Sequence, residues 1–123
     1  SEDPKYWEQA TARVVELLAV RDYFSKDYYP LTEYSTADDA RIAWQFFDPS
    51  RESGIVQAFR RAKAADVPLH VTLRGLDAGI TYLINNQDTG DKITGTGSDL
   101  MSKGFDITIK DAPGSALFIY AKQ

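Results

Sequence analysis

The sequence predicts a mainly β protein, an antiparallel β-sandwich of about seven to eight strands with one N-terminal α-helix. Short runs of alternating apolar and polar residues recur through residues 27–123. Clusters of Gly, Pro, Asn and Asp separate these runs about every ten residues, which is the spacing of an antiparallel sandwich. Only residues 4–24 repeat their apolar positions at the three- and four-residue intervals of a helix. At 123 residues the chain has the length of one domain and can bury a sizeable core.

The predicted helix begins near Pro4, which suits a first helical turn, with Asp3 as its cap. A single apolar stripe follows, made of Trp7, Ala10, Val14, Leu17, Leu18 and Arg21. We favour the interpretation that this stripe packs on the sandwich. The other interpretation is that it docks on a domain outside the chain, and helical periodicity alone does not separate the two.

Aromatic residues crowd the next segment, residues 22–39. Pro30 disfavours a helical conformation at Tyr29, and we expect a short strand over residues 30–34. The aromatic side chains here are Tyr23, Phe24, Tyr28 and Tyr29. Their faces can stack on the apolar face of a sugar ring. Linkers between packed domains use aromatic residues as well, and we favour that interpretation.

Residues 42–61 predict the central β-hairpin of the sandwich. In its first arm Ile42, Trp44 and Phe46 share one face, because strand side chains alternate with a period of two. This apolar face is expected to form a wall of the core. The turn over residues 48–54 contains Asp, Pro, Ser and Gly, which favour tight turns. The return arm places Ile55 and Phe59 on one face and Val56 and Ala58 on the other.

Five further strands are predicted over residues 67–73, 80–84, 92–96, 105–109 and 116–120. In the first of them Val67, Leu69, Val71 and Leu73 are expected to face the core. His70 is expected to lie on the surface of the same strand. One helical turn is expected over residues 98–104, capped by Ser98 and ended by Gly104.

Composition excludes several classes of function. The chain contains no cysteine and one histidine, which excludes disulfides, cysteine-based zinc sites and a histidine-rich metal site. Its 18 acidic and 14 basic side chains give a net charge of −4, which disfavours nucleic-acid binding. No apolar run approaches the roughly 18 residues of a membrane span. We therefore expect a soluble domain without a metal or another cofactor.

Two polar clusters have the composition of functional sites but not the required spacing. Asp38 and Asp39 are adjacent in sequence, so their side chains point apart, and we interpret them as part of a solvated turn. The loop that begins at Asn86 resembles a calcium loop in composition, but Gly97 stands where an EF-hand requires a bidentate Glu. We predict a hairpin turn there and no catalytic residue in this chain.

A series of turn and strand signatures runs through most of the chain. They are Asp27-Tyr28-Tyr29-Pro30-Leu31-Thr32, Trp44-Gln45-Phe46, Gly54-Ile55-Val56, Phe59-Arg60-Arg61, Leu73-Arg74-Gly75-Leu76-Asp77, Tyr82, Asp88-Thr89-Gly90, Gly97 with Leu100-Met101, Gly104-Phe105, Ser115-Ala116-Leu117 and Tyr120. In this order they resemble the C-terminal β-sandwich of α-galactosidases of glycoside hydrolase family 36 and related members of the same clan. Ala78 departs from that pattern, which usually has a proline after the aspartate.

The resemblance implies a division of the chain into two parts. Residues 27–123 would be the C-terminal β-sandwich, and residues 1–26 would be a helix and linker, the tail of a preceding (β/α) barrel. The two catalytic aspartates of such a retaining glycoside hydrolase would lie on that barrel. No catalytic position is therefore carried over to this chain.

Two functions follow from these expectations. The favoured one is a non-catalytic accessory domain that packs on the catalytic barrel and stabilises it. The alternative is a carbohydrate-binding module that contacts galactosides or plant polysaccharide through exposed aromatic residues; the candidates are Trp44, Tyr28 and Tyr29, with Tyr34 in addition. A binding platform requires Trp44 to face solvent, whereas the predicted alternation buries Trp44 between the sheets.

Overall fold

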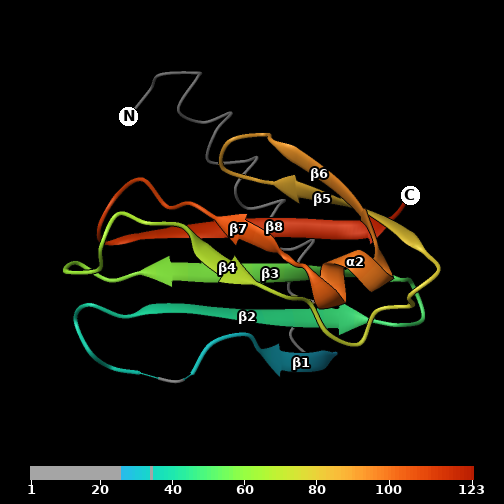
Figure 1. The fold of residues 1–123 in the computed structure, drawn as a ribbon, viewed down its shortest axis with the longest axis horizontal. Coiled ribbons are helices and arrows are strands. Elements are labelled where there is room, and N and C mark those ends of the chain that lie inside the picture. Colours follow the sequence, from blue (N-terminus) through green and yellow to red (C-terminus); the bar gives the residue numbers. More distant parts are fainter. Residues whose placement is uncertain (1–25, 34) are drawn as a thin grey trace, which may run out of the picture.

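A computed structural model describes residues 26–33 and 35–123, which form two β-sheets and one short helix (Figure 1). The elements are β1 (Asp27–Pro30), β2 (Arg41–Asp48), β3 (Ser53–Arg60), β4 (Leu69–Val71), β5 (Thr81–Asn86), β6 (Lys92–Thr96), α2 (Gly97–Ser102), β7 (Phe105–Ile107) and β8 (Gly114–Lys122). The helix predicted over residues 4–24 lies outside the described residues, as do Tyr23, Phe24 and Tyr34.

The larger sheet has six antiparallel strands in the order β1-β2-β3-β8-β5-β6. The smaller sheet pairs β4 with β7, also antiparallel, and together with α2 it forms a second layer on the larger sheet (Figure 1). The predicted fold class, mainly β with antiparallel sheets, is confirmed. Within the described part of the chain, no helix is long and apolar enough to cross a membrane.

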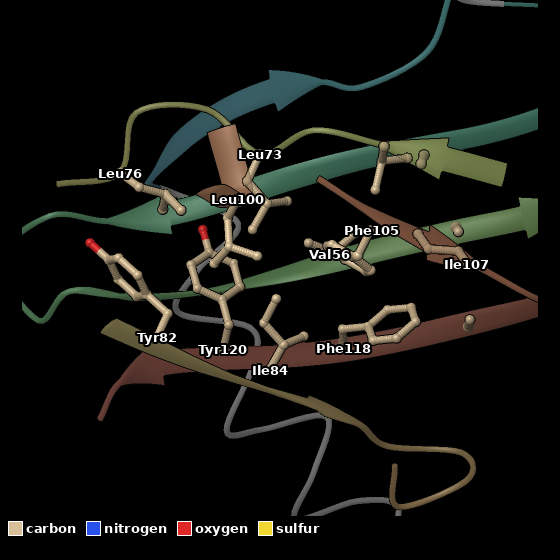
Figure 2. Close-up of a cluster of buried hydrophobic side chains, with 14 of the residues drawn as sticks. Val56, Leu73, Leu76, Tyr82, Ile84, Leu100, Phe105, Ile107, Phe118 and Tyr120 are labelled. Carbon is tan, nitrogen blue, oxygen red and sulfur yellow. The ribbon is translucent and has the colours of Figure 1, made fainter. Parts of the chain in front are cut away.

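The core lies between the two layers (Figure 2). From the second layer it receives Val71, Leu73, Leu76, Leu100, Phe105 and Ile107, and from the larger sheet Ala43, Phe47, Val56, Ala58, Tyr82, Ile84, Ala116, Phe118 and Tyr120. The rings of Phe105 and Phe118 meet edge to face across the layers, with centroids 5.6 Å apart. This one cluster joins the two layers into one domain.

The predicted central hairpin is present, but its two faces are the reverse of those expected. β2 and β3 pair from Arg41–Arg60 to Asp48–Ser53. The core side carries Ala43 and Phe47, whereas Trp44 points to the opposite side of the sheet and is only partly buried. The prediction that Trp44 lies between the sheets is therefore wrong. Both faces of this hairpin are apolar, so alternation defines two faces but does not say which one the second layer covers.

Three other expectations change in detail. The first strand ends at Pro30 instead of beginning there, since a proline cannot donate a ladder hydrogen bond. The strand expected over residues 67–73 shortens to three residues and leaves Val67 exposed. His70 is exposed, as predicted. The helical turn α2 is capped by Thr96 rather than Ser98: the Thr96 hydroxyl accepts a hydrogen bond from the Asp99 amide.

Candidate functional site: an aromatic outer face

The six-stranded sheet has a second apolar surface on the side opposite β4, β7 and α2, which we call the outer face. Cross-strand register builds it: Tyr28 pairs with Phe46, Phe46 with Ile55, and Ile55 with Ile119, so these side chains form one row. A second row runs from Trp44 through Gln57 to Leu117. The outer face consists of Tyr28, Ile42, Trp44, Phe46, Ile55, Gln57, Phe59, Leu117 and Ile119.

Aromatic contacts organise one end of this face. The rings of Trp44 and Phe59 lie 5.2 Å apart between centroids, and those of Tyr28 and Phe46 lie 5.3 Å apart. The indole N–H of Trp44 donates a 2.7 Å hydrogen bond to the Gln57 side-chain oxygen. Because Gln57 is the cross-strand partner of Trp44, this bond ties the indole to the neighbouring strand. The result is a rigid aromatic surface.

Exposure varies strongly across the outer face. Tyr28 is 54% exposed and Phe59 is 37% exposed, while Trp44 and Phe46 are partly buried. Two grooves flank Trp44. A groove of 390 Å³ runs between Trp44 and Tyr28, and one of 480 Å³ lies between Trp44 and the segment Arg60–Ala62. Large apolar side chains that remain exposed in a patch mark an interaction surface.

Two polar side chains at these grooves, Arg60 and Thr32, are engaged within the domain. The Arg60 guanidinium donates to three backbone carbonyls, those of Ala64, Ile109 and Lys110. The Thr32 hydroxyl accepts a 3.1 Å bond from the Ala43 amide. These bonds connect loops to the sheet, so the same donors and acceptors serve the fold rather than a bound ligand. The face is thus mainly apolar, with the charged side chains of Asp38 and Arg61 at the edge of one groove.

The structure separates the three candidate site residues. Tyr28 and Trp44 share the outer face, where Phe46 and Phe59 join them. Tyr29 points the other way and packs against the core, with the Arg74 guanidinium 5.6 Å from its ring centroid. The sequence analysis places Phe59 on the same face as Ile55 but does not single it out as a site residue. Its pairing with Ile42 across the hairpin is the signal that places both residues on the face of Trp44.

Asp38, Asp39 and His70, whose side chains could serve catalysis or metal binding, are exposed to solvent. Within residues 26–33 and 35–123, no group of three or more His, Asp or Glu side chains is placed to hold a metal ion. Asp38 and Asp39 are both exposed, and Asp38 lies 3.7 Å from the Arg61 guanidinium. The imidazole of His70 contacts the exposed Asp106 carboxylate at 2.8 Å on the small sheet. Asp38 lines the 480 Å³ groove beside Trp44, whereas Asp39, His70 and Asp106 line neither groove of the outer face.

A comparison with known protein families identifies the family of this chain. Residues 41–119 match the model of the glycosyl hydrolase family 36 C-terminal domain. The chain belongs to this family. The match spans both layers and, of the strands described, leaves out only β1 and the last three residues of β8. The family identified from the turn and strand signatures is confirmed.

Solved structures share the fold of this family 36 C-terminal domain. The α-galactosidase AgaB of Geobacillus stearothermophilus superposes with a TM-score of 0.73 at 22% identity, and AgaA of the same organism with 0.72 at 20%, each over 94% of this chain. The galactosidase domain of the α-galactosidase-sucrose kinase AgaSK gives 0.66 at 17% over the whole chain. The domain spans 16% of each of these chains. No curated protein matches it.

Proposed function

We propose that this domain is the non-catalytic accessory domain of an α-galactosidase-like, retaining glycoside hydrolase. In this proposal it packs on the catalytic (β/α) barrel and stabilises it, and residues 1–26 are the tail of that barrel. Membership of the family 36 C-terminal domain supports the proposal, as does the small share of the α-galactosidase chains that the domain spans. Retaining hydrolysis needs two carboxyl groups about 5 Å apart across the scissile bond, a task we assign to the barrel.

The observation that carries the proposal is the apolar outer face with its aromatic margin, in which Tyr28 and Phe59 are exposed and Trp44 is partly buried. Burying apolar surface contributes about 25 cal/mol per Å². A face of this composition therefore gains stability when another protein surface covers it. Its lining is mainly apolar, and the polar groups of Thr32, Gln57 and Arg60 are engaged, which suits a packed domain interface better than a polyhydroxylated ligand.

The test uses the full-length parent enzyme. Phe59→Asp places a charge in the proposed interface and is expected to lower the melting temperature and the half-life of activity, with kcat/KM at low temperature unchanged. Val67→Asp is the matched control, because Val67 is also apolar and exposed but precedes β4 in the second layer. Equal melting temperatures for Phe59→Asp, Val67→Asp and wild type would overturn the proposal.

A second candidate function, carbohydrate binding, is favoured by one observation: Tyr28 and Trp44 lie on a solvent-facing side of the sheet with a groove between them. Aromatic side chains of this kind can stack on a galactoside. An amide-shift NMR titration of the domain with galactose, melibiose and a galactomannan oligosaccharide tests it. Saturable shifts around Trp44 support this function, and unchanged spectra reject it.

A further inference from the structure

Ile55 is completely buried although its side chain points away from the core. It lies on the outer face, in the row between Phe46 and Ile119. Among the described residues its apolar neighbours are Phe46, Leu117 and Ile119, and these four form a cluster separate from the main core. We call it the Ile55 cluster. At the margin of the same face Tyr28 and Phe59 are exposed, so burial is confined to the middle of the sheet.

The second layer does not supply this burial. All four members of the Ile55 cluster come from β2, β3 and β8, and β4, β7 and α2 contribute only to the main core. A strand side chain on an open sheet face keeps part of its surface in contact with water, even between large neighbours. Complete burial of Ile55 therefore points to a cover that does not come from the helix and strands of residues 26–33 and 35–123.

Residues 4–24 have the composition and length of such a cover. Their apolar stripe of Trp7, Ala10, Val14, Leu17 and Leu18 has helical spacing. A helix of this length extends about 30 Å. Six strands at about 4.8 Å spacing extend about 24 Å from the first to the last, so one helix suffices to cross the middle of the sheet.

Chain connectivity brings this segment to the correct face. It joins the described chain at Lys26, directly before β1. β1 is the edge strand next to β2, and its Tyr28 stacks on Phe46 of the Ile55 cluster. A segment that ends there needs only a short connection to lie over Ile55, Leu117 and Ile119.

We propose that residues 4–24 form an amphipathic helix that docks in cis on the Ile55 cluster and leaves the margin of Tyr28, Trp44 and Phe59 open. The outer face is then divided into an internal dock and a free aromatic margin. This inference does not depend on the proposed function, because it requires no protein other than this chain.

A spin label tests the placement directly. The chain has no cysteine, so Ala121→Cys introduces a unique attachment site for a nitroxide. Ala121 is exposed on β8, two residues from Ile119 and on the same face. The label is expected to broaden the amide signals of residues 7–21 strongly. A label at His70→Cys, exposed on the opposite layer, is expected to broaden them much less. Equal broadening from both labels, or none, would overturn the proposal.

The same experiment identifies a competing occupant. Mixing spin-labelled unenriched chain with unlabelled ¹⁵N chain reports only contacts between molecules. Broadening of the Ile55, Leu117 and Ile119 signals in this mixture would mean that a second copy covers the cluster, and would overturn the docking in cis. An unaffected spectrum, together with broadening within the labelled chain, supports it.

Two matched variants give a second measurement. Val14→Asp places a charge in the stripe, and Ala12→Asp places the same charge on the opposite side of the expected helix. Val14→Asp is expected to shift the methyl signals of Ile55, Leu117 and Ile119 and to lower the melting temperature. Ala12→Asp is expected to do neither. Identical behaviour of the two variants would contradict the proposal, whatever the outcome of the Phe59→Asp experiment in the parent enzyme.

Discussion

Gln45 on β2 donates a 2.8 Å hydrogen bond to the Tyr120 hydroxyl on β8, passing over β3, which lies between the two strands. The Tyr120 hydroxyl in turn donates to the Phe46 carbonyl at 3.2 Å. Gly54 of β3 makes this crossing possible. A Cβ atom at position 54 would collide with the Tyr120 hydroxyl and the Phe46 carbonyl oxygen. The packing on the core side of the sheet thus depends on a residue without a Cβ atom at position 54.

Gly54→Ala is expected to lower the free energy of unfolding by about 3 kcal/mol, because one of its two clashing partners is backbone and cannot move aside. Urea denaturation followed by circular dichroism measures the change. Gly79→Ala is the control: the nearest atom to its Cβ is the Asp77 carboxylate at an ordinary 3.7 Å. A Gly54→Ala variant as stable as Gly79→Ala would show that the Phe46 carbonyl and the Tyr120 ring do not approach Gly54 so closely.

Gln45→Leu is expected to cost about 2 to 3 kcal/mol of unfolding free energy. The buried amide of Gln45 bonds both the carbonyl and the N–H of Arg74 as well as Tyr120, and leucine leaves these buried groups without that partner. Gln57→Leu, on the outer face, removes the hydrogen bond to Trp44 and is expected to cost about 1 kcal/mol or less. Equal losses measured in parallel urea titrations would contradict this difference.

The orientation of the central hairpin gives a third prediction. Phe47 is 1% exposed in the core, and its ring lies 6.0 Å from that of Tyr120, so Phe47→Ala is expected to cost about 4 kcal/mol. Trp44 lies half-buried on the outer face, and Trp44→Ala is expected to cost about half as much. Thermal unfolding of both variants measures the order. A larger loss for Trp44→Ala would restore the orientation expected from the sequence.

The sequence predicts the strands of this domain better than the faces they present. Asp48, Pro49 and Gly54 bracket the turn between two alternating arms, and the hairpin forms there. Trp44 and Phe47 are nevertheless equally suited to a core by their chemistry. What buries Phe47 is the second layer, whose strands are far away along the chain, so local alternation carries no information about it.

The candidate site shows the same limit. Tyr28 and Tyr29 are adjacent tyrosines, and the sequence analysis names both as candidate site residues. The pairing of β1 with β2 sends Tyr28 to the outer face beside Phe46, and Tyr29 to the side where Arg74 covers its ring. The family, in contrast, was recognisable because its turn signatures depend on local backbone chemistry, which a sequence displays directly.

Tyr82 makes stability sensitive to alkaline pH. Its hydroxyl donates to the Glu52 carboxylate at 2.8 Å and accepts from the Asp77 amide at 3.1 Å. Burial, with the hydrogen bond to Glu52, raises the pKa of Tyr82 from 10.0 to about 12. A group whose pKa is raised on folding stabilises the protein fully below its unfolded pKa, and this contribution disappears as the pH rises from 10 to 12.

Tyr82→Phe is therefore expected to have two effects. At neutral pH it lowers the unfolding free energy by about 1 to 2 kcal/mol, because the bonds to Glu52 and Asp77 are lost. Between pH 10 and 12 the unfolding free energy of the variant falls less steeply with pH than that of the wild type. Unfolding free energies measured at pH 8, 10 and 11 test both effects, with Tyr28→Phe at neutral pH as the exposed control. Parallel pH profiles for wild type and Tyr82→Phe would contradict the linkage.

Asp48 has the opposite linkage, at acid pH. Its carboxylate accepts hydrogen bonds from the Ser50 hydroxyl at 2.6 Å and from Arg51 at 2.7 Å. The Ser50 hydroxyl, followed by Arg51, lowers the pKa of Asp48 from 3.8 to about 2. A group whose pKa falls on folding contributes its full stabilisation above the unfolded value, so this contribution is lost as the pH drops from about 4 towards 2.

Asp48→Asn is expected to flatten the dependence of unfolding free energy on pH between 4 and 2, because the variant has no proton to bind at this position. Ser50→Ala and Arg51→Ala each remove one donor and should flatten it partially, Ser50→Ala more than Arg51→Ala, since the Ser50 hydroxyl has the larger influence on the carboxyl. Urea unfolding at pH 4.5, 3.5 and 2.5, values that bracket the window expected from the linkage relation, gives the slopes. If all four proteins lose stability in parallel, the turn that joins β2 to β3 does not hold a charged Asp48, and acid sensitivity arises elsewhere in the chain.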